Sequence, residues 1–228
     1  MPKNDVNLDH CLKCFYCDTA CPVMQVAPAY PGPKRLGPEW ERIRLEHVDS
    51  DSNWVEYCTG CGQCDLACPQ QVKVSEMIAR AKAEHAASSS HRFRDRLLAK
   101  PAMLGKLGSA VPALTNITLG PKPLRTLLSA CLDTASERQF PAYHRPMPLV
   151  HDKADGKERV LFFPGCFVRY NAPEVGEATV EVLRKNGFAV EMADFACCGL
   201  PSIANGDRQE LLSDVRKNLA LMQETAER

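Results

Sequence analysis

A cysteine pattern that occurs twice constrains this chain more than any other feature of its sequence. The first copy runs from Cys11 to Pro22 and the second from Cys58 to Pro69, and both read C-x2-C-x2-C-x3-C-P without gaps. This spacing is typical of protein loops that hold [4Fe–4S] clusters. A single C-x-x-C pair also occurs in zinc sites and thiol redox motifs, whereas two full copies favour iron–sulfur ligation.

The proline after each fourth cysteine predicts how the eight cysteines divide. Proline pushes the residue before it toward an extended conformation, so the chain leaves the first cluster there and the fourth cysteine binds the other cluster. Each cluster is thus expected to take three ligands from one run and one from the other. The predicted ligands are Cys11, Cys14, Cys17 and Cys68 for cluster 1, and Cys21, Cys58, Cys61 and Cys64 for cluster 2.

Two other uses of cysteine fit the sequence less well. Zinc sites usually take their four cysteines from two separated C-x-x-C pairs. A disulfide framework is typical of secreted chains, and the first ten residues, MPKNDVNLDH, lack the apolar region of a signal peptide. The predicted clusters also need a reducing compartment, so the chain is expected on the cytoplasmic side of a membrane.

Charge and hydropathy narrow the class of partner. Lysine plus arginine equals aspartate plus glutamate, at 28 each, whereas nucleic-acid-binding domains carry a basic excess. No run reaches the roughly 18 apolar residues of a spanning helix. The uncharged segment 107–121 is short and interrupted by proline, and it is expected either as a buried linker or as a surface segment against a membrane or partner. We expect peripheral membrane association and no nucleic-acid partner.

Three regions follow one another along the chain. Residues 1–90 are predicted to form a two-[4Fe–4S] ferredoxin-type domain, residues 91–158 a helical connector, and residues 159–228 a partial cysteine-rich domain. In the first region, a proline-rich insertion precedes a charged helical segment that begins after Pro38, which favours a mostly helical domain. Ser75 is expected to cap the next helix.

The connector and the last region differ in their patterns. Residues 91–99 and 124–138 of the connector are predicted helices, with Cys131 as core filler. From residue 159, short strands over 159–163 and 189–195 alternate with helices, the first capped by Asn171 and the last opened by Asp207. This alternation predicts a small parallel α/β layer of the order βαβα, and hence an α+β fold for the whole chain.

Three further cysteines follow these two strands. Cys166 comes after the first strand, and Cys197 and Cys198 come after the second. The carboxyl ends of adjacent parallel strands share one edge of a sheet, where ligands bind. We therefore expect these three side chains to converge there as an incomplete third metal or redox site.

The cysteines and the segments around them resemble a known family. The C-x30-C-C-G pattern is similar to the CCG domain of heterodisulfide reductase subunits and of iron–sulfur subunits of respiratory dehydrogenases. The nearer resemblance is to the family of C subunits of anaerobic glycerol-3-phosphate dehydrogenases. It is carried by Tyr30-Pro-Gly-Pro-Lys34, Gly37-Pro38, Glu41-Arg42, Phe163-Pro-Gly-Cys-Phe-Val-Arg-Tyr-Asn171, Cys197-Cys-Gly-Leu-Pro201 and Ile203-Ala-Asn-Gly206.

The resemblance implies a non-catalytic electron-transfer subunit with two [4Fe–4S] clusters. A flavoprotein partner would oxidise sn-glycerol 3-phosphate, and electrons would pass through this chain to membrane menaquinone. The chain itself has no G-x-G-x-x-G fingerprint of a flavin or nicotinamide site. The family's domain continues to a C-x-x-C, whereas no cysteine follows Cys198 here, so a third cluster is expected only where the domain is completed.

Other functions stay open at this stage. One is a subunit of a related complex that oxidises lactate or glycolate. Another is an enzyme like heterodisulfide reductase, which would act at the cysteine-rich domain. The third is an iron–sulfur redox sensor, although the balanced charge offers no nucleic-acid-binding element.

Overall fold

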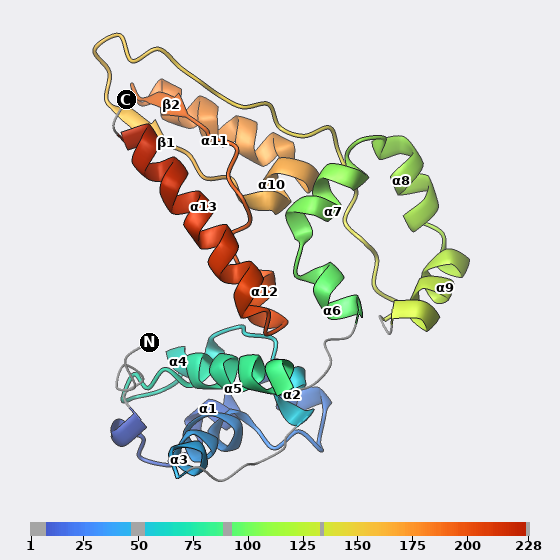
Figure 1. Ribbon diagram of the computed structural model, residues 1–228, viewed down its shortest axis with the longest axis vertical. Coiled ribbons are helices and arrows are strands. Elements are labelled where there is room, and N and C mark those ends of the chain that lie inside the picture. Colours follow the sequence, from blue (N-terminus) through green and yellow to red (C-terminus); the bar gives the residue numbers. More distant parts are fainter. Residues whose placement is uncertain (1–7, 47–52, 89–92, 133–134, 227–228) are drawn as a thin grey trace. The chain divides into compact units, whose positions relative to one another are not determined.

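The computed structural model describes residues 8–46, 53–88, 93–132 and 135–226 (Figure 1). These residues are mostly helical and include one sheet of two parallel strands, which confirms the mostly helical α+β prediction. The chain divides into two units, residues 1–95 with 201–208 and residues 96–200 with 209–228. Each unit has a hydrophobic core of its own.

The first unit consists of short helices around the two cysteine loops (Figure 1). Its core gathers Leu36, Val55, Val72, Met77 and Ile78 beneath several of the cysteines. The helices are η1 (Leu8–His10), α1 (Tyr16–Thr19), α2 (Pro22–Val26), the π-helix η2 (Arg35–Glu39), α3 (Trp40–Leu45), η3 (Asn53–Tyr57), α4 (Gln63–Leu66) and α5 (Val74–Ser88).

Helix α5 organises this unit. Its apolar positions Val74, Met77, Ile78 and Ala81 recur at helical spacing and are buried. They pack against η2 and η3. The contact with η2 is close, because a Cβ added to Gly37 would lie 2.8 Å from Cγ1 of Val74. A larger residue at position 37 would push η2 away from α5.

Two sequence predictions about helix starts in this unit are wrong. Ser75 lies inside the first turn of α5 and does not cap it; the Asp65 carboxylate instead accepts the Ser75 amide at 2.8 Å and its hydroxyl at 2.5 Å. Pro38 does not open a helix but lies inside η2. The wider turn of a π-helix accommodates a ring that would clash in an α-helix. Helix α3 ends at Leu45, and residues 47–52 lie outside the described part.

The second unit holds the connector helices and the sheet. The connector helices are α6 (Phe93–Leu98), α7 (Pro101–Gly108), α8 (Pro112–Leu119) and α9 (Lys122–Leu132). The α/β elements are β1 (Arg159–Leu161), α10 (Gly165–Asn171), α11 (Pro173–Lys185), β2 (Ala189–Glu191), α12 (Leu200–Ala204), which reaches into the first unit, and α13 (Arg208–Ala226). Residues 89–92 and 133–134 of the two predicted connector helices, and the Cys131 side chain, lie outside the described part.

The sheet has the predicted parallel pairing, with Arg159 opposite Ala189 and Leu161 opposite Glu191. Helix α11 buries Val180 on β2, where Val190 and Met192 form the core together with Met147. Both strands are three residues long, which is shorter than predicted.

The start of α11 also differs from the prediction. Asn171 ends α10, and its side-chain amide donates to the carbonyl of Ala142 at 2.9 Å. Helix α11 instead begins at Pro173, with Ala172 as the residue before it. The fixed φ of proline suits a first helical position, where no amide donor is needed.

The uncharged segment 107–121 forms the end of α7, a short turn and α8 (Figure 1). Several of its apolar side chains are exposed, with Leu107 at 66%, Leu114 at 58% and Ile117 at 70%. The buried-linker interpretation is therefore wrong for these side chains. No helix in the described part of the chain is long and apolar enough to cross a membrane.

Candidate iron–sulfur sites

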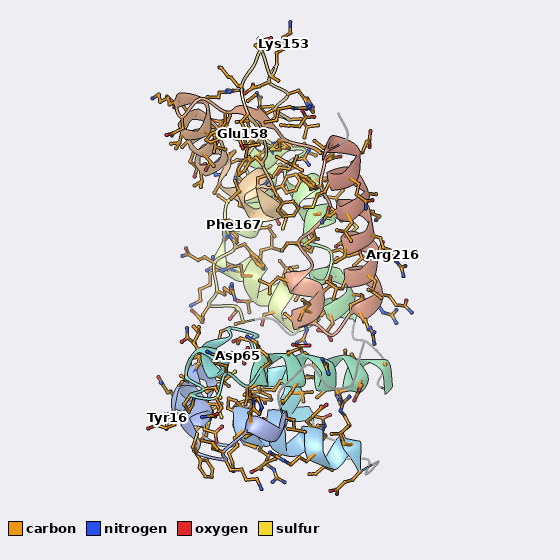
Figure 2. All side chains as sticks on the ribbon, turned by 90° about the vertical axis from the view of Figure 1, so that its left-hand side faces the viewer. Tyr16, Asp65, Lys153, Glu158, Phe167 and Arg216 are labelled. Atoms are coloured by element: carbon orange, nitrogen blue, oxygen red, sulfur yellow. The ribbon has the colours of Figure 1, made fainter. Side chains whose placement is uncertain are left out.

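The two cysteine loops share one backbone conformation. Two residues of the first loop, Lys13 and Phe15, have left-handed φ values of 58° and 67°. The equivalent residues of the second loop, Gly60 and Gly62, have φ values of 69° and 73°. Each loop then enters a single helical turn, α1 or α4, and these two turns contact each other. Tyr16 and Asp65, one from each turn, lie toward the same edge of this unit in Figure 2.

A cavity brings together three cysteines of the first run and one of the second. Its lining includes Cys11, Cys14, Cys17 and Cys68, and the other lining residues are largely apolar. The cavity encloses about 360 Å³ of empty space, part of it open to solvent. Four soft thiolates around one apolar cavity match the ligand set of a cubane cluster, in which each thiolate binds a different iron.

The other four predicted ligands are Cys21, Cys58, Cys61 and Cys64, and they affect the pKa values of groups around them. Burial is the main cause that raises the pKa of Cys58, and the nearby Cys21 and Cys61 raise it further. Burial also raises the pKa of the Tyr30 hydroxyl, with added contributions from Cys58, Cys21 and Cys64. Cys21 of the first run thus acts on Cys58 of the second run, in the direction of the crossed assignment.

The aspartate after the third cysteine anchors each loop. The Asp18 carboxylate accepts the amide of Lys34 at 2.8 Å, and the Asp65 carboxylate accepts the amide of Ser75 at 2.8 Å. The thiols of Cys17 and Cys64 each donate to the aspartate that follows, at 3.9 and 3.8 Å. The same carboxylate therefore fixes both a cysteine and the segment that closes over it.

These thiols hold their protons in the absence of iron. Burial, with the adjacent aspartate as the next cause, raises the pKa of Cys17 and of Cys64 to about 12. Metal ligation needs thiolates, so iron binding must displace these protons. The Cys68 sulfur accepts the Val72 amide at 3.4 Å.

Lysines lie beside both predicted ligand sets, and the exposed Lys13 lines the cavity of the first set together with Lys34. Lys34 lines the cavity of cluster 1, where its ammonium lies 3.8 Å from the centre of the Phe15 ring and 2.5 Å from a Glu39 oxygen. Lys82, on α5, is buried and donates to the carbonyl of Cys58 at 2.7 Å. Basic groups at these positions offset the negative charge that thiolates bring to a cluster.

The cysteines of the third predicted site are also neighbours. The Cys166 and Cys197 thiols are hydrogen-bonded, which lowers the pKa of Cys166 to about 7 and raises that of Cys197. Cys198 is exposed, and its charge acts on Cys166. Among the described residues, no three His, Cys, Asp or Glu side chains are close enough to share a single metal ion.

Helix α13 holds the loop that carries Cys197. Asn218 accepts the Ala196 amide at 2.8 Å and donates to the Cys197 carbonyl at 2.9 Å, and it is buried. Gly199 has a φ of 86°, and an added Cβ would collide with the Leu211 side chain. The loop conformation is thus fixed by the protein without a bound metal.

Sequence reasoning missed the roles of Asp18, Asp65, Lys82 and Asn218, and it named Tyr30 and Lys34 only as part of a segment that resembles a family. The aspartates carried a usable signal, because both cysteine runs read C-D-x-A-C-P at their ends. Lys82 and Asn218 carried none, because their contacts join residues that are far apart in the sequence. Lys82 and Cys58 are separated by 24 positions, and Asn218 and Cys197 by 21.

Comparison with known protein families agrees with both regions. Residues 7–72 match the 4Fe–4S dicluster domain, and residues 160–228 match the cysteine-rich domain. The chain therefore carries an iron–sulfur domain followed by a cysteine-rich domain. No solved structure is significantly similar to it.

Individual proteins extend this similarity. The C subunit of the anaerobic glycerol-3-phosphate dehydrogenase of Escherichia coli strain K12 is 38% identical over 210 residues, which cover 89% of this chain and 53% of that protein. The B subunit of the fumarate reductase (CoM/CoB) of Methanothermobacter marburgensis is 43% identical over 61 residues, which cover 26% of this chain and 12% of that protein. Lactate utilization protein A of Bacillus pumilus is 39% identical over 70 residues, which cover 30% of this chain and 29% of that protein.

These relatives differ in how much of the chain they match. The chain spans about half the length of the glycerol-3-phosphate dehydrogenase subunits, and the predicted resemblance to them is confirmed. The other two match less than a third of it.

Proposed function

We propose that this chain is the iron–sulfur electron-transfer subunit of an anaerobic glycerol-3-phosphate dehydrogenase. One observation supports it most: the cavity lined by Cys11, Cys14, Cys17 and Cys68 combines both cysteine runs, as two interlocked cubane sites require. The similarity over 89% of the chain favours this substrate class over lactate, glycolate or a heterodisulfide. A flavoprotein partner would carry out the dehydrogenation.

The protein's own groups would prepare both sites for electron transfer. Bound [4Fe–4S] clusters would supply one-electron chemistry, with Cys11, Cys14, Cys17 and Cys68 holding one and Cys21, Cys58, Cys61 and Cys64 the other. The contact between α1 and α4 keeps the two loops adjacent. Asp18 and Asp65 fix the loops, and the buried core excludes water from beneath them.

Iron content and partner dependence test the proposal. The chain purified anaerobically should contain about eight irons with matching sulfide, as two cubanes require. It should not oxidise glycerol 3-phosphate alone. Addition of a glycerol-3-phosphate-oxidising flavoprotein should reduce its clusters when substrate is present. Zinc in place of iron, or clusters that stay oxidised with an active flavoprotein, would contradict the assignment.

We also propose peripheral attachment to the cytoplasmic face of the inner membrane, with menaquinone as the acceptor beyond this chain. The exposed Leu107, Leu114 and Ile117 support it, since apolar side chains beside lysines fit a lipid interface. Lys106 and Lys122 flank this segment. Leu114→Glu should weaken sedimentation with anionic lipid vesicles, whereas Gln209→Glu, which adds the same charge at an exposed position outside this segment, should have less effect. Equal binding by all three proteins would exclude this surface.

A further inference from the structure

The amino group of Lys82 is placed differently from any ordinary surface lysine. The residue is 8% exposed, and its ammonium donates to the carbonyls of Cys58 at 2.7 Å and Ala204 at 2.9 Å. Both of these acceptors are neutral backbone groups. Burial lowers the pKa of the Lys82 ammonium, and the nearby Cys58, Glu56 and Asp95 act in the opposite direction.

Packing holds this lysine in place. Residues 201–208 belong to the first unit and lie against α5. An added Cβ on Gly206 would be 3.0 Å from the Lys82 carbonyl and 2.9 Å from the Ala86 side chain. Gly206 also has a φ of 73°, which few other residues adopt without strain. The segment therefore covers Lys82 and fixes the second carbonyl that its ammonium contacts.

The lysine beside the other site is neutralised. The Lys34 ammonium contacts a Glu39 oxygen at 2.5 Å, and the Asp18 carboxylate is also close. The charge of Lys34 near cluster 1 is thus balanced by carboxylates, and Lys13, which also lines that cavity, is exposed to solvent. The charge of Lys82 near cluster 2 is solvated only by carbonyls, and its burial limits screening by salt.

We infer that Lys82 is a positioning residue that raises the reduction potential of the cluster held by Cys21, Cys58, Cys61 and Cys64 above that of the other cluster. The inference rests on the two clusters of the proposed function. A reduced cluster carries one more negative charge than an oxidised one, so a fixed cation beside it stabilises the reduced form. Electrons that enter the pair therefore collect on cluster 2.

The test is a redox titration of the anaerobic full chain, followed by electron paramagnetic resonance. Cys14→Ser and Cys61→Ser, one exposed ligand from each set, assign the two signals. Lys82→Met removes the charge, Lys82→Gln removes it but keeps a donor, and Lys82→Arg keeps it. Lys73→Met is the matched control, because it removes the same charge from an exposed position.

We expect the wild-type potential of cluster 2 to exceed that of cluster 1. Lys82→Met and Lys82→Gln should each lower the potential of cluster 2 by at least 59 mV, which corresponds to a tenfold change in the one-electron equilibrium constant. Cluster 1 should shift less, and Lys82→Arg and Lys73→Met should stay near wild type.

Two results would overturn the inference. One is a wild-type potential of cluster 2 below that of cluster 1. The other is a neutral variant that retains both clusters and in which the potential of cluster 2 is unchanged or shifts no more than that of cluster 1. If neither neutral variant retains both clusters, the order of the two potentials in the wild-type protein decides whether the inference holds. Fewer than two clusters in the wild type would instead refute the proposed function.

Discussion

The two cysteine loops have the same backbone conformation but carry different residues at the two positions with left-handed φ values. The second loop places Gly60 and Gly62 at its two left-handed positions, whereas the first loop places Lys13 and Phe15 there. A left-handed φ costs a residue with a Cβ about 1 to 2 kcal/mol. The conformation is therefore imposed by the arrangement of the cysteines, and glycine is only the less costly way to adopt it.

Contacts offset the strain in the first loop. The Phe15 ring lies under the Lys34 ammonium, and Lys34 in turn contacts Glu39 and donates its amide to Asp18. The second loop has no side chain at position 62 and depends on Asp65, which binds both the amide and the hydroxyl of Ser75. The first loop is thus held by contacts to its strained residue Phe15 as well as by Asp18. The second loop is held by the contact of Asp65 with the start of α5.

The largest expected effect tests whether the loops exchange their fourth ligands. Cys21→Ser should abolish the cluster held by Cys58, Cys61 and Cys64 and leave the other, since Cys21 is the predicted fourth ligand of that cluster and acts on Cys58. Iron should fall from about eight to about four per chain. Cys131→Ser, which lies outside all predicted sites, should retain the full content. Loss of only the cluster bound by Cys11 would disprove the crossed assignment.

The next largest expected effect distinguishes Asp65 from Asp18 by how much each stabilises the first unit. Asp65→Ala should destabilise the first unit by about 1.5 to 3 kcal/mol, because it removes charged hydrogen bonds to two groups of Ser75. Both substitutions also remove the acceptor of the preceding cysteine thiol. Beyond that, Asp18→Ala removes the acceptor of one group, the Lys34 amide, and should cost less. Anaerobic urea denaturation measures both. Asp65→Asn is the control that keeps an acceptor, and an equal loss in both alanine variants would contradict the distinction.

A smaller effect tests backbone strain directly. An added Cβ on Gly60 meets no atom within 4 Å, so Gly60→Ala should cost only the conformational strain of about 1 to 2 kcal/mol. The equivalent change in the first loop, Lys13→Gly, should be neutral or stabilise by up to about 1 kcal/mol, because relief of strain exceeds the added chain entropy. The same denaturation measurement applies, and a strongly destabilised Lys13→Gly protein would show that the Lys13 side chain has another role.

The smallest effect concerns the ring that supports the first loop. Phe15→Leu should cost about 0.5 to 1 kcal/mol, since it keeps an apolar side chain but removes the cation–π contact with Lys34. In a Lys34→Met background, the same substitution should cost little. A full cost in that background would attribute the effect of Phe15 to packing alone.

Local patterns predicted much of this molecule. The doubled motif identified the cysteines of both loops, and the alternation after residue 159 predicted the parallel pairing of β1 and β2. Helix α13 begins next to the predicted Asp207. These features depend on neighbouring residues, which is why spacing and periodicity carry them. The predictions that Ser75 and Asn171 cap helices are wrong. The carboxylate of Asp65 binds Ser75 instead, and Pro173 begins α11.

The sequence by itself determined which residues are chemically suited to bind clusters and the alternation of strands and helices after residue 159. Only the tertiary structure decided which charges lie beside each site. Lys82 and Ala204 are separated by 122 positions, and no local pattern links them. Their contact depends on the packing of α5 against the 201–208 segment, so the buried charge beside Cys58 exists only in the folded chain.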